Sequence, residues 1–164
     1  MAAGMSIANE NIDEFRKRLN EQTTLTDEDI IPKVSIDMPL MLKDINYNLI
    51  DEISLLEPYG KANSKPSFGM KNLKIIEAKV LGKDRNVLRM KLSDNNLYID
   101  GIYFGDIQGF EENIKLIYGE DEYNKLFNGY PNNVRIDAVC FPEINEFKGN
   151  KKVQLIIQNY RLHI

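Results

Sequence analysis

The sequence predicts an α+β protein whose main part is a five-stranded β-barrel, preceded by a shorter region of helices and one strand. Residues 68–162 carry five strand-like segments, and one helical segment separates the third from the fourth. GKANSKP, at 60–66, is rich in turn-forming residues and divides this β-rich part from the helical patterns before it. We therefore expect two domains, at 1–60 and 61–164.

The first sixty residues combine a strand-like start with two amphipathic helical patterns. Residues 1–7 are mostly small or apolar and are typical of a strand whose partners lie elsewhere. Apolar residues recur at helical spacing over 12–19 and again over 45–56. Asp44 is a suitable N-cap for the second helix, and Pro58 cannot continue it.

The order of segments after Gly60 predicts the topology of the barrel. Polar turns at 82–86 and 94–96 join the first three strands, and 142–151 is expected to be a loop between the last two. The order β-β-β-α-β-β is that of the OB-fold, a five-stranded Greek-key barrel. A generic small barrel or a split α+β sheet would have the same order. The expected strands are 68–81, 87–92, 97–104, 134–141 and 152–162, and the helical segment is 106–127, with a break at Gly119.

Charge is distributed unevenly along the chain. Residues 1–60 hold 5 Lys/Arg against 12 Asp/Glu, and residues 61–164 hold 16 against 13. The helical segment 106–127 accounts for 2 of those basic and 6 of those acidic residues, so the β-rich remainder has a net charge of +7. A basic body of this kind is compatible with a polyanionic partner, and equally with solvated faces that happen to segregate.

The residue types that carry most hydrolytic chemistry are missing or isolated. His163 is the single histidine, and we expect it to be an exposed tail residue. Cys140 is the single cysteine, lies in an apolar strand and is expected to pack as a small hydrophobe. The Asp27-Glu28-Asp29 cluster could bind a cation, although a helix N-terminus or a solvated loop explains it more simply. We predict no catalytic residue, no metal ligand and no cofactor in this chain.

The cysteine count, the N-terminal residues and the length of the apolar runs predict the cellular location. One cysteine cannot form an intrachain disulfide, and nothing in the N-terminal residues resembles a secretory signal. No apolar run is long enough to span a membrane, so we expect no membrane partner and a cytoplasmic protein.

The remaining chemistry is that of binding. Single-stranded nucleic acid is held by basic grooves that follow its phosphates and by aromatic side chains that stack on its bases. In an OB-fold these groups lie on strands 2–3 and on the loops between strands 1–2 and 4–5. The candidate nucleic-acid-binding residues at those places are Lys83, Arg85, Arg89, Lys91, Tyr98, Tyr103, Phe147, Lys148, Lys151 and Lys152.

Five of these candidates also have a simpler structural explanation. Tyr98 and Tyr103 are an odd number of residues apart, so in a regular strand they face opposite sides and at most one stacks on a base. Phe147 could instead fill the end of the barrel. Arg89 and Lys91 could be ordinary surface residues of an outer strand face.

Three stretches carry a resemblance to a known family. LEPYG at 56–60 is followed by Asn63, Pro66 and Phe68, although Ala62 and Ser64 stand where that family usually has Gly and Pro. NEFKG at 145–149 is followed by VQL at 153–155, and a weaker match is IDGIYFG at 99–105. Together they resemble the C-terminal part of the RecJ family of single-strand-specific DNA exonucleases. MAAG at 1–4 is similar to the end of a glycine- and histidine-containing element in the DHH-associated domain of that family.

The resemblance has consequences for the parent protein. It implies that 1–60 is the end of a DHH-associated domain and that 61–164 is an OB-fold domain. It further implies a metal-dependent 5′–3′ single-stranded-DNA exonuclease of DNA repair and recombination, with Mn²⁺ or Mg²⁺ held by motifs that would precede Met1. The expected partners are single-stranded DNA, the missing N-terminal catalytic domains and other repair proteins. The alternative is a docking module that positions the catalytic core or a partner without binding DNA.

Overall fold

The computed structural model describes residues 4–31 and 33–163, and its contacts divide the chain into two compact units, Met1–Val34 and Ser35–Ile164. The first unit contains a 3-10 helix, η1 (Asn9–Asn11), and two α-helices, α1 (Ile12–Gln22) and α2 (Asp27–Ile30). None of its described residues is buried.

The strand expected at 1–7 is not formed where it can be checked. Residues 1–3 lie outside the described part, and residues 4–7 have no regular secondary structure. A strand needs a partner for its backbone N–H and C=O groups, and the described residues of this unit offer none.

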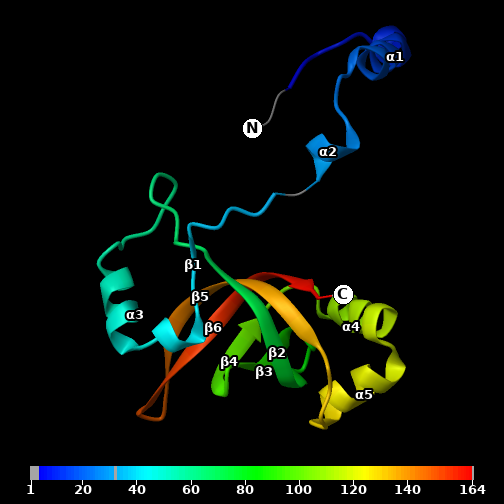
Figure 1. Ribbon diagram of the computed structural model, residues 1–164. Coiled ribbons are helices and arrows are strands. Elements are labelled where there is room, and N and C mark those ends of the chain that lie inside the picture. The colour runs from blue at the N-terminus through cyan, green and yellow to red at the C-terminus, as the bar shows by residue number, and fades with distance from the viewer. Residues whose placement is uncertain (1–3, 32, 164) are drawn as a thin grey trace. The chain divides into compact units, whose positions relative to one another are not determined.

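The second unit is a closed β-barrel of the OB type, as the order of segments predicted. Its five barrel strands are β2 (Phe68–Leu81), β3 (Val87–Asp94), β4 (Leu97–Tyr103), β5 (Arg135–Phe147) and β6 (Asn150–Leu162). They follow the order β2-β3-β4-β6-β5, and a β2–β5 pairing closes the barrel. β4 and β6 run parallel, while the other barrel pairs are antiparallel (Figure 1).

The strand β2 pairs with β3 along one half and with β5 along the other. Two register shifts, between Met70 and Leu73 and between Ile75 and Glu77, accompany this change of partner. Asn72, with φ 57°, lies in the first of them. Bulges bend and twist a strand, which is what a long strand needs in order to serve two sides of a small barrel.

The connection at 142–151 is a β-hairpin, so the loop expected there is wrong. β5 continues to Phe147 and β6 begins at Asn150, and the two-residue turn between them has φ 50° at Lys148 and 79° at Gly149. Positive φ at both turn residues matches the right-handed twist of the flanking strands. Pro142 had indicated a break, but β5 pairs with β2 only as far as Cys140, and proline is tolerated where a strand has an unpaired edge.

Two helices between β4 and β5 complete the core. α4 (Ile107–Tyr118) begins where the Asp106 carboxylate accepts a hydrogen bond of 2.9 Å from the Gly109 N–H. It ends at Gly119, as predicted, and α5 (Glu120–Asn128) follows it. Phe110 of α4 is fully buried and meets the ring of Tyr160 edge-on at 5.1 Å. The apolar face of this helical insert is therefore part of the barrel core.

The segment before the barrel packs on it. It contains a short strand β1 (Met38–Pro39), parallel to the start of β2, a 3-10 helix η2 (Leu42–Asp44) and α3 (Tyr47–Ser54). Leu40, Leu42 and Ile53 join the barrel core. The N-cap of α3 is Asn46 rather than Asp44: its side chain accepts from the Leu49 N–H at 2.9 Å.

The residues of the LEPYG stretch fix the end of α3. The Tyr59 hydroxyl donates to the Ile53 carbonyl at 2.9 Å, and its ring meets Phe141 of β5 edge-on at 6.3 Å. The side-chain amide of Asn63 donates to the carbonyls of Leu56 and Pro58. Residues 35–60 thus belong to the same compact unit as the barrel, and the assignment of 1–60 to a DHH-associated domain stays a prediction. No helix among the described residues is long and apolar enough to cross a membrane.

Candidate nucleic-acid interface

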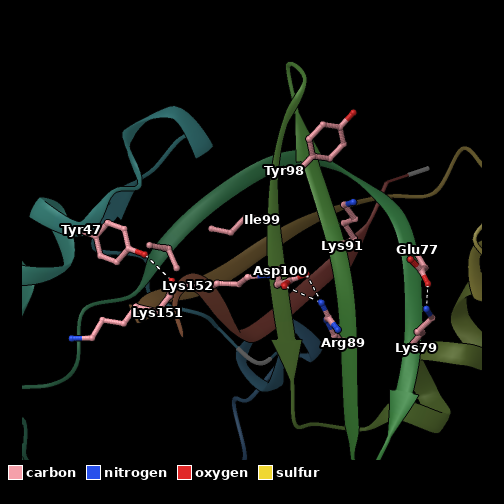
Figure 2. A pocket seen from close by; sticks show the side chains of 11 residues that line it. Tyr47, Glu77, Lys79, Arg89, Lys91, Tyr98, Ile99, Asp100, Lys151 and Lys152 are labelled. Carbon is pink, nitrogen blue, oxygen red and sulfur yellow. Dashed lines mark hydrogen bonds and ion pairs between the residues drawn. The ribbon is translucent and has the colours of Figure 1, made fainter. Parts of the chain in front are cut away.

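A groove of about 530 Å³ crosses the outer face of the barrel (Figure 2). Its walls and floor come from α3, β2, β3, β4 and the start of β6, so residues far apart in the sequence meet there. Most of them are charged or aromatic. The lining residues are Tyr47, Glu77, Lys79, Arg89, Lys91, Tyr98, Ile99, Asp100, Lys151, Lys152 and Val153.

Strand periodicity places the charged residues of the floor on one face. Lys91 of β3 lies between Glu77 of β2 and Asp100 of β4 as their cross-strand partner, and Lys79 is paired with Arg89 in the next row. The residues that alternate with them, including Ala78, Leu88 and Met90, are buried in the core. The same alternation that fills the core therefore lines the groove.

The groove exists because β4 and β6 diverge at one end. Their parallel pairing begins at Asp100 and Gln154, so Tyr98 on one side and Lys152 on the other precede the first paired residues. On the far side α3 supplies Tyr47, whose hydroxyl donates to the Lys151 carbonyl at 3.0 Å. This hydrogen bond ties α3 to the β5–β6 hairpin (Figure 2).

Some of the basic groups in the groove are already paired. Arg89 contacts the Asp100 carboxylate at 3.0 Å, Lys79 pairs with Glu77, and Lys151 lies 3.5 Å from Glu146. Neither Lys91 nor Lys152 forms a salt bridge with any described residue. The Lys91 ammonium instead lies 5.4 Å from the centre of the Tyr98 ring, which is 58% exposed. Two unpaired ammonium groups and one open aromatic face are thus available to a ligand.

Five of the ten predicted binding residues lie together in this groove: Arg89, Lys91, Tyr98, Lys151 and Lys152. Lys83 and Arg85 do not line it. They lie in the turn between β2 and β3, where the Arg85 guanidinium pairs with Glu111 of α4 at 3.1 Å.

The other predicted residues have different surroundings. Tyr103 is half-buried and meets Tyr160 edge-on at 5.4 Å, so its ring packs as part of the core boundary. Phe147 and Lys148 lie at the tip of the β5–β6 hairpin, outside the groove lining. Phe147 is 67% exposed, so it does not fill the barrel end, and the Lys148 ammonium lies 5.4 Å from the centre of its ring.

Four polar groove residues were not among the predicted ones. Glu77 and Lys79 flank the buried Ala78 of β2, but the register shift between Ile75 and Glu77 interrupts the alternation that is regular around Arg89 and Lys91 of β3, so the sequence pattern did not indicate them. Asp100 is the cross-strand partner of Lys91, which only the register reveals. Tyr47 reaches the groove because α3 packs on β5 and its hydroxyl donates to the Lys151 carbonyl of β6, contacts for which the sequence carries no signal.

The residues considered for catalysis or metal binding have structural roles. Burial raises the pKa of the Cys140 thiol to about 12, which leaves it without nucleophilic character at neutral pH. Asp29 forms a capping box with Thr26, whose hydrogen bonds lower the pKa of the carboxyl group. Among residues 4–31 and 33–163 no group of three or more His, Cys, Asp or Glu residues is placed to hold a metal ion.

His163 is not the free tail residue that was expected. Its Nε2 lies 2.5 Å from the Asp137 carboxylate, which Arg161 also contacts, at 2.6 Å. Burial of Asp137 opposes its ionisation. The hydrogen bonds from the Asn72 N–H, Arg161 and His163 outweigh that cost and lower its pKa to about 2. This carboxylate thus joins the bulge of β2 to the end of β6.

Comparisons with known proteins agree with this fold. The family model described as "RecJ OB domain" matches residues 36–159. The single-stranded-DNA-specific exonuclease RecJ of Bacillus subtilis is 30% identical over 161 residues, which are 97% of this chain and 18% of that protein. RecJ of Haemophilus influenzae is 26% identical, over 96% of this chain and 25% of that protein. The chain therefore spans about a fifth to a quarter of the length of these relatives.

A solved structure supports the fold independently. The crystal structure of Thermus thermophilus RecJ in complex with Mn²⁺ superposes with a TM-score of 0.59 at 17% identity, over 95% of this chain and 20% of that one. A second crystal structure of the same protein, in complex with Mg²⁺, gives the same TM-score. The family match spans β1 to β6 and includes every residue that lines the groove. The chain belongs to the RecJ OB domain family.

Proposed function

We propose that the groove binds single-stranded DNA and that this chain is the DNA-binding part of a RecJ-like exonuclease. One observation carries the proposal: Lys91, Lys152 and the exposed ring of Tyr98 share one groove, and neither lysine is neutralised by a described residue. An unpaired ammonium attracts a phosphate, and an open aromatic face stacks on a base of any sequence.

The shape of the groove also suits a single strand. It is lined by residues of two hairpins, β3–β4 and β5–β6, so a flexible DNA strand that enters it would cross β3 and β4. Ion pairs such as Arg89–Asp100 shape the floor and reduce its net charge, so binding is expected to be moderate in strength and sensitive to salt.

The activity of the whole protein is part of the same proposal. The parent would be a metal-dependent 5′–3′ exonuclease of the DHH family that acts in DNA repair and recombination in the cytoplasm. Its Mn²⁺ or Mg²⁺ ions would be held by domains other than this one. The similarity to the single-stranded-DNA-specific exonuclease RecJ of Bacillus subtilis, and to the RecJ of Thermus thermophilus crystallised with Mn²⁺ and with Mg²⁺, supports this.

Fluorescence anisotropy with a labelled single-stranded oligonucleotide tests the binding. The affinity should fall linearly with salt on a log–log plot, and the duplex of the same sequence should compete poorly. Incubating this chain with Mn²⁺ or Mg²⁺ and labelled single-stranded DNA should give no cleavage. Cleavage that follows the protein peak through purification would contradict the role of a binding domain alone.

A docking role is the second candidate, and a different surface favours it. Leu116 of α4 is 82% exposed and is followed by the acidic start of α5, where Glu120, Asp121 and Glu122 lie. These three carboxylates are paired with Lys115 and Lys125, so the exposed Leu116 side chain is the feature that a partner with an apolar face would cover. Leu116→Asp should abolish that interaction and leave DNA binding unchanged, whereas no DNA binding even at low salt would favour docking as the main role.

A further inference from the structure

One row of cross-strand partners runs across the floor of the groove and continues around the barrel. It contains Glu77 of β2, Lys91 of β3, Asp100 of β4, Gln154 of β6 and Glu143 of β5, each paired in register with the next. Gln154 donates to the Glu143 carboxylate at 2.8 Å. The row thus contains three carboxylates and one basic side chain, Lys91, and two of the carboxylates, Glu77 and Asp100, line the groove. Carboxylates at this position are unusual for a groove that accepts a polyanion.

The two carboxylates inside the groove keep free acceptor capacity. The side chains of Glu77 and Asp100 are 32% and 28% exposed, and each has one basic partner, Lys79 or Arg89, in the adjacent row. An ionised carboxylate offers about four lone-pair sites, and one basic partner does not use them all. Both groups therefore remain open to a second donor from the solvent side.

These carboxylates restrict the path that a bound DNA strand can take through the groove. A phosphate is repelled by them, so the backbone should follow the ammonium groups of Lys91 beside Tyr98 and of Lys151 and Lys152 at the start of β6. The bases would then turn towards the Asp100 carboxylate. Figure 2 shows the Asp100 carboxylate lying between these two sets of basic side chains.

A base that meets a carboxylate must offer a donor. Cytosine presents its N4 amino group, for which Asp and Glu are the usual acceptors. Thymine has a single N–H between two carbonyl oxygens, which a carboxylate repels. We propose that Asp100 and Glu77 give the groove a preference for cytosine over thymine in single strands; this rests on the proposed DNA binding.

The test compares oligo(dC) and oligo(dT) of about 12 nucleotides, within the site size of one OB-fold. Fluorescence anisotropy is measured at slightly alkaline pH, where cytosine strands do not pair with one another. The wild-type chain should bind oligo(dC) about fivefold to tenfold more tightly, the lower end of the discrimination expected for one good base contact. Asp100→Asn should bring the two affinities close together, because its amide can donate to thymine O4 as well as accept from cytosine.

Glu112→Gln is the matched control, because it removes one negative charge from α4, outside the groove. It should leave the dC/dT ratio unchanged. If Asp100→Asn raises both affinities equally and keeps the ratio, Asp100 acts only as a repelling charge and the inference is wrong. Glu77→Gln provides a second variant if the loss of the Arg89 ion pair unfolds the first.

The two proposals fail in different ways. Equal affinities of the wild-type chain for both oligonucleotides overturn the base preference and leave DNA binding intact. Absence of binding to either one at low salt overturns both.

Discussion

Removing the lysines of the groove should weaken single-strand binding by an amount that the structure predicts. The perturbation is the triple variant Lys91→Ala, Lys151→Ala and Lys152→Ala, whose side chains line the groove. Each phosphate neutralised on a single strand releases about 0.7 counterion, so three contacts should flatten the log–log salt slope by about 2 and lower the affinity at 0.1 M salt by up to about a hundredfold. The ion pair of Lys151 with Glu146 lowers its share, so these values are upper bounds.

The assay is anisotropy with one labelled oligonucleotide over a series of salt concentrations. Its control replaces three exposed lysines that do not line the groove, Lys43, Lys61 and Lys71, with alanine. Both variants lose the same net charge, so a general electrostatic effect would change both slopes equally. An equal change, with both folds intact by circular dichroism, would refute the assignment of the binding site to the groove.

Four further predictions concern single features. Tyr98→Ala should cost about 1–3 kcal/mol of binding free energy, as loss of one stacked base does, and leave the salt slope unchanged in the same titration. The double variant Lys83→Ala and Arg85→Ala should lose several-fold less affinity for the oligonucleotide than the variant without the groove lysines, because Arg85 is paired with an acidic side chain of α4. An equal loss of affinity in the two variants would extend the site to the β2–β3 turn. Asp137→Asn should lower the free energy of unfolding at neutral pH by at most about 2 kcal/mol, measured by urea denaturation. Phe110→Ala should lower it by about 3–5 kcal/mol, because it leaves a large cavity in the core.

The Asp137 prediction has a definite dependence on pH. The pKa of the carboxyl group in the folded chain, about 2, lies below its ordinary value of 3.8, so the ionised form stabilises the fold. That contribution is complete above pH 3.8 and is lost as the pH falls towards 2. The wild-type chain should therefore lose stability relative to Asp137→Asn in this window, and Asp84→Asn, at an exposed turn position, should behave like the wild type. Parallel pH profiles of wild type and Asp137→Asn would contradict the role of this carboxylate.

The barrel could be predicted because its strands obey local rules. The alternation of Leu88, Met90 and Leu92 with basic residues predicts both the strand β3 and which of its faces points outward. Asn95 and Asn96 tolerate the positive φ values that the turn of the β3–β4 hairpin requires. The β5–β6 hairpin was missed because Pro142 indicates a break wherever the pairing of a strand is unknown. Which edge of β5 is unpaired depends on its contacts with β2 and β6, which the sequence does not reveal.

The lining of the candidate groove was predictable in part for the same reason. Arg89 and Lys91 follow from strand alternation, whereas the pairing of Arg85 with Glu111 and the burial of Tyr103 against Tyr160 depend on where the helical insert packs. Tyr47 was not predicted, because it comes from a helix assigned to another domain and reaches the groove through the packing of α3 on β5 and its hydrogen bond to Lys151. Tertiary contacts between distant segments therefore account for the differences between the predicted residues and those that line the groove.

Titration of the ¹⁵N-labelled chain with a single-stranded oligonucleotide, followed by NMR, tests most directly whether the groove is the binding site. We expect the largest shift changes of backbone amides at Lys91, Tyr98, Asp100 and Lys152, with little change in α4 and α5. Shift changes concentrated on α4 and α5 would contradict this claim. So would the absence of shift changes at a ratio of oligonucleotide to protein that saturates binding in the anisotropy assay.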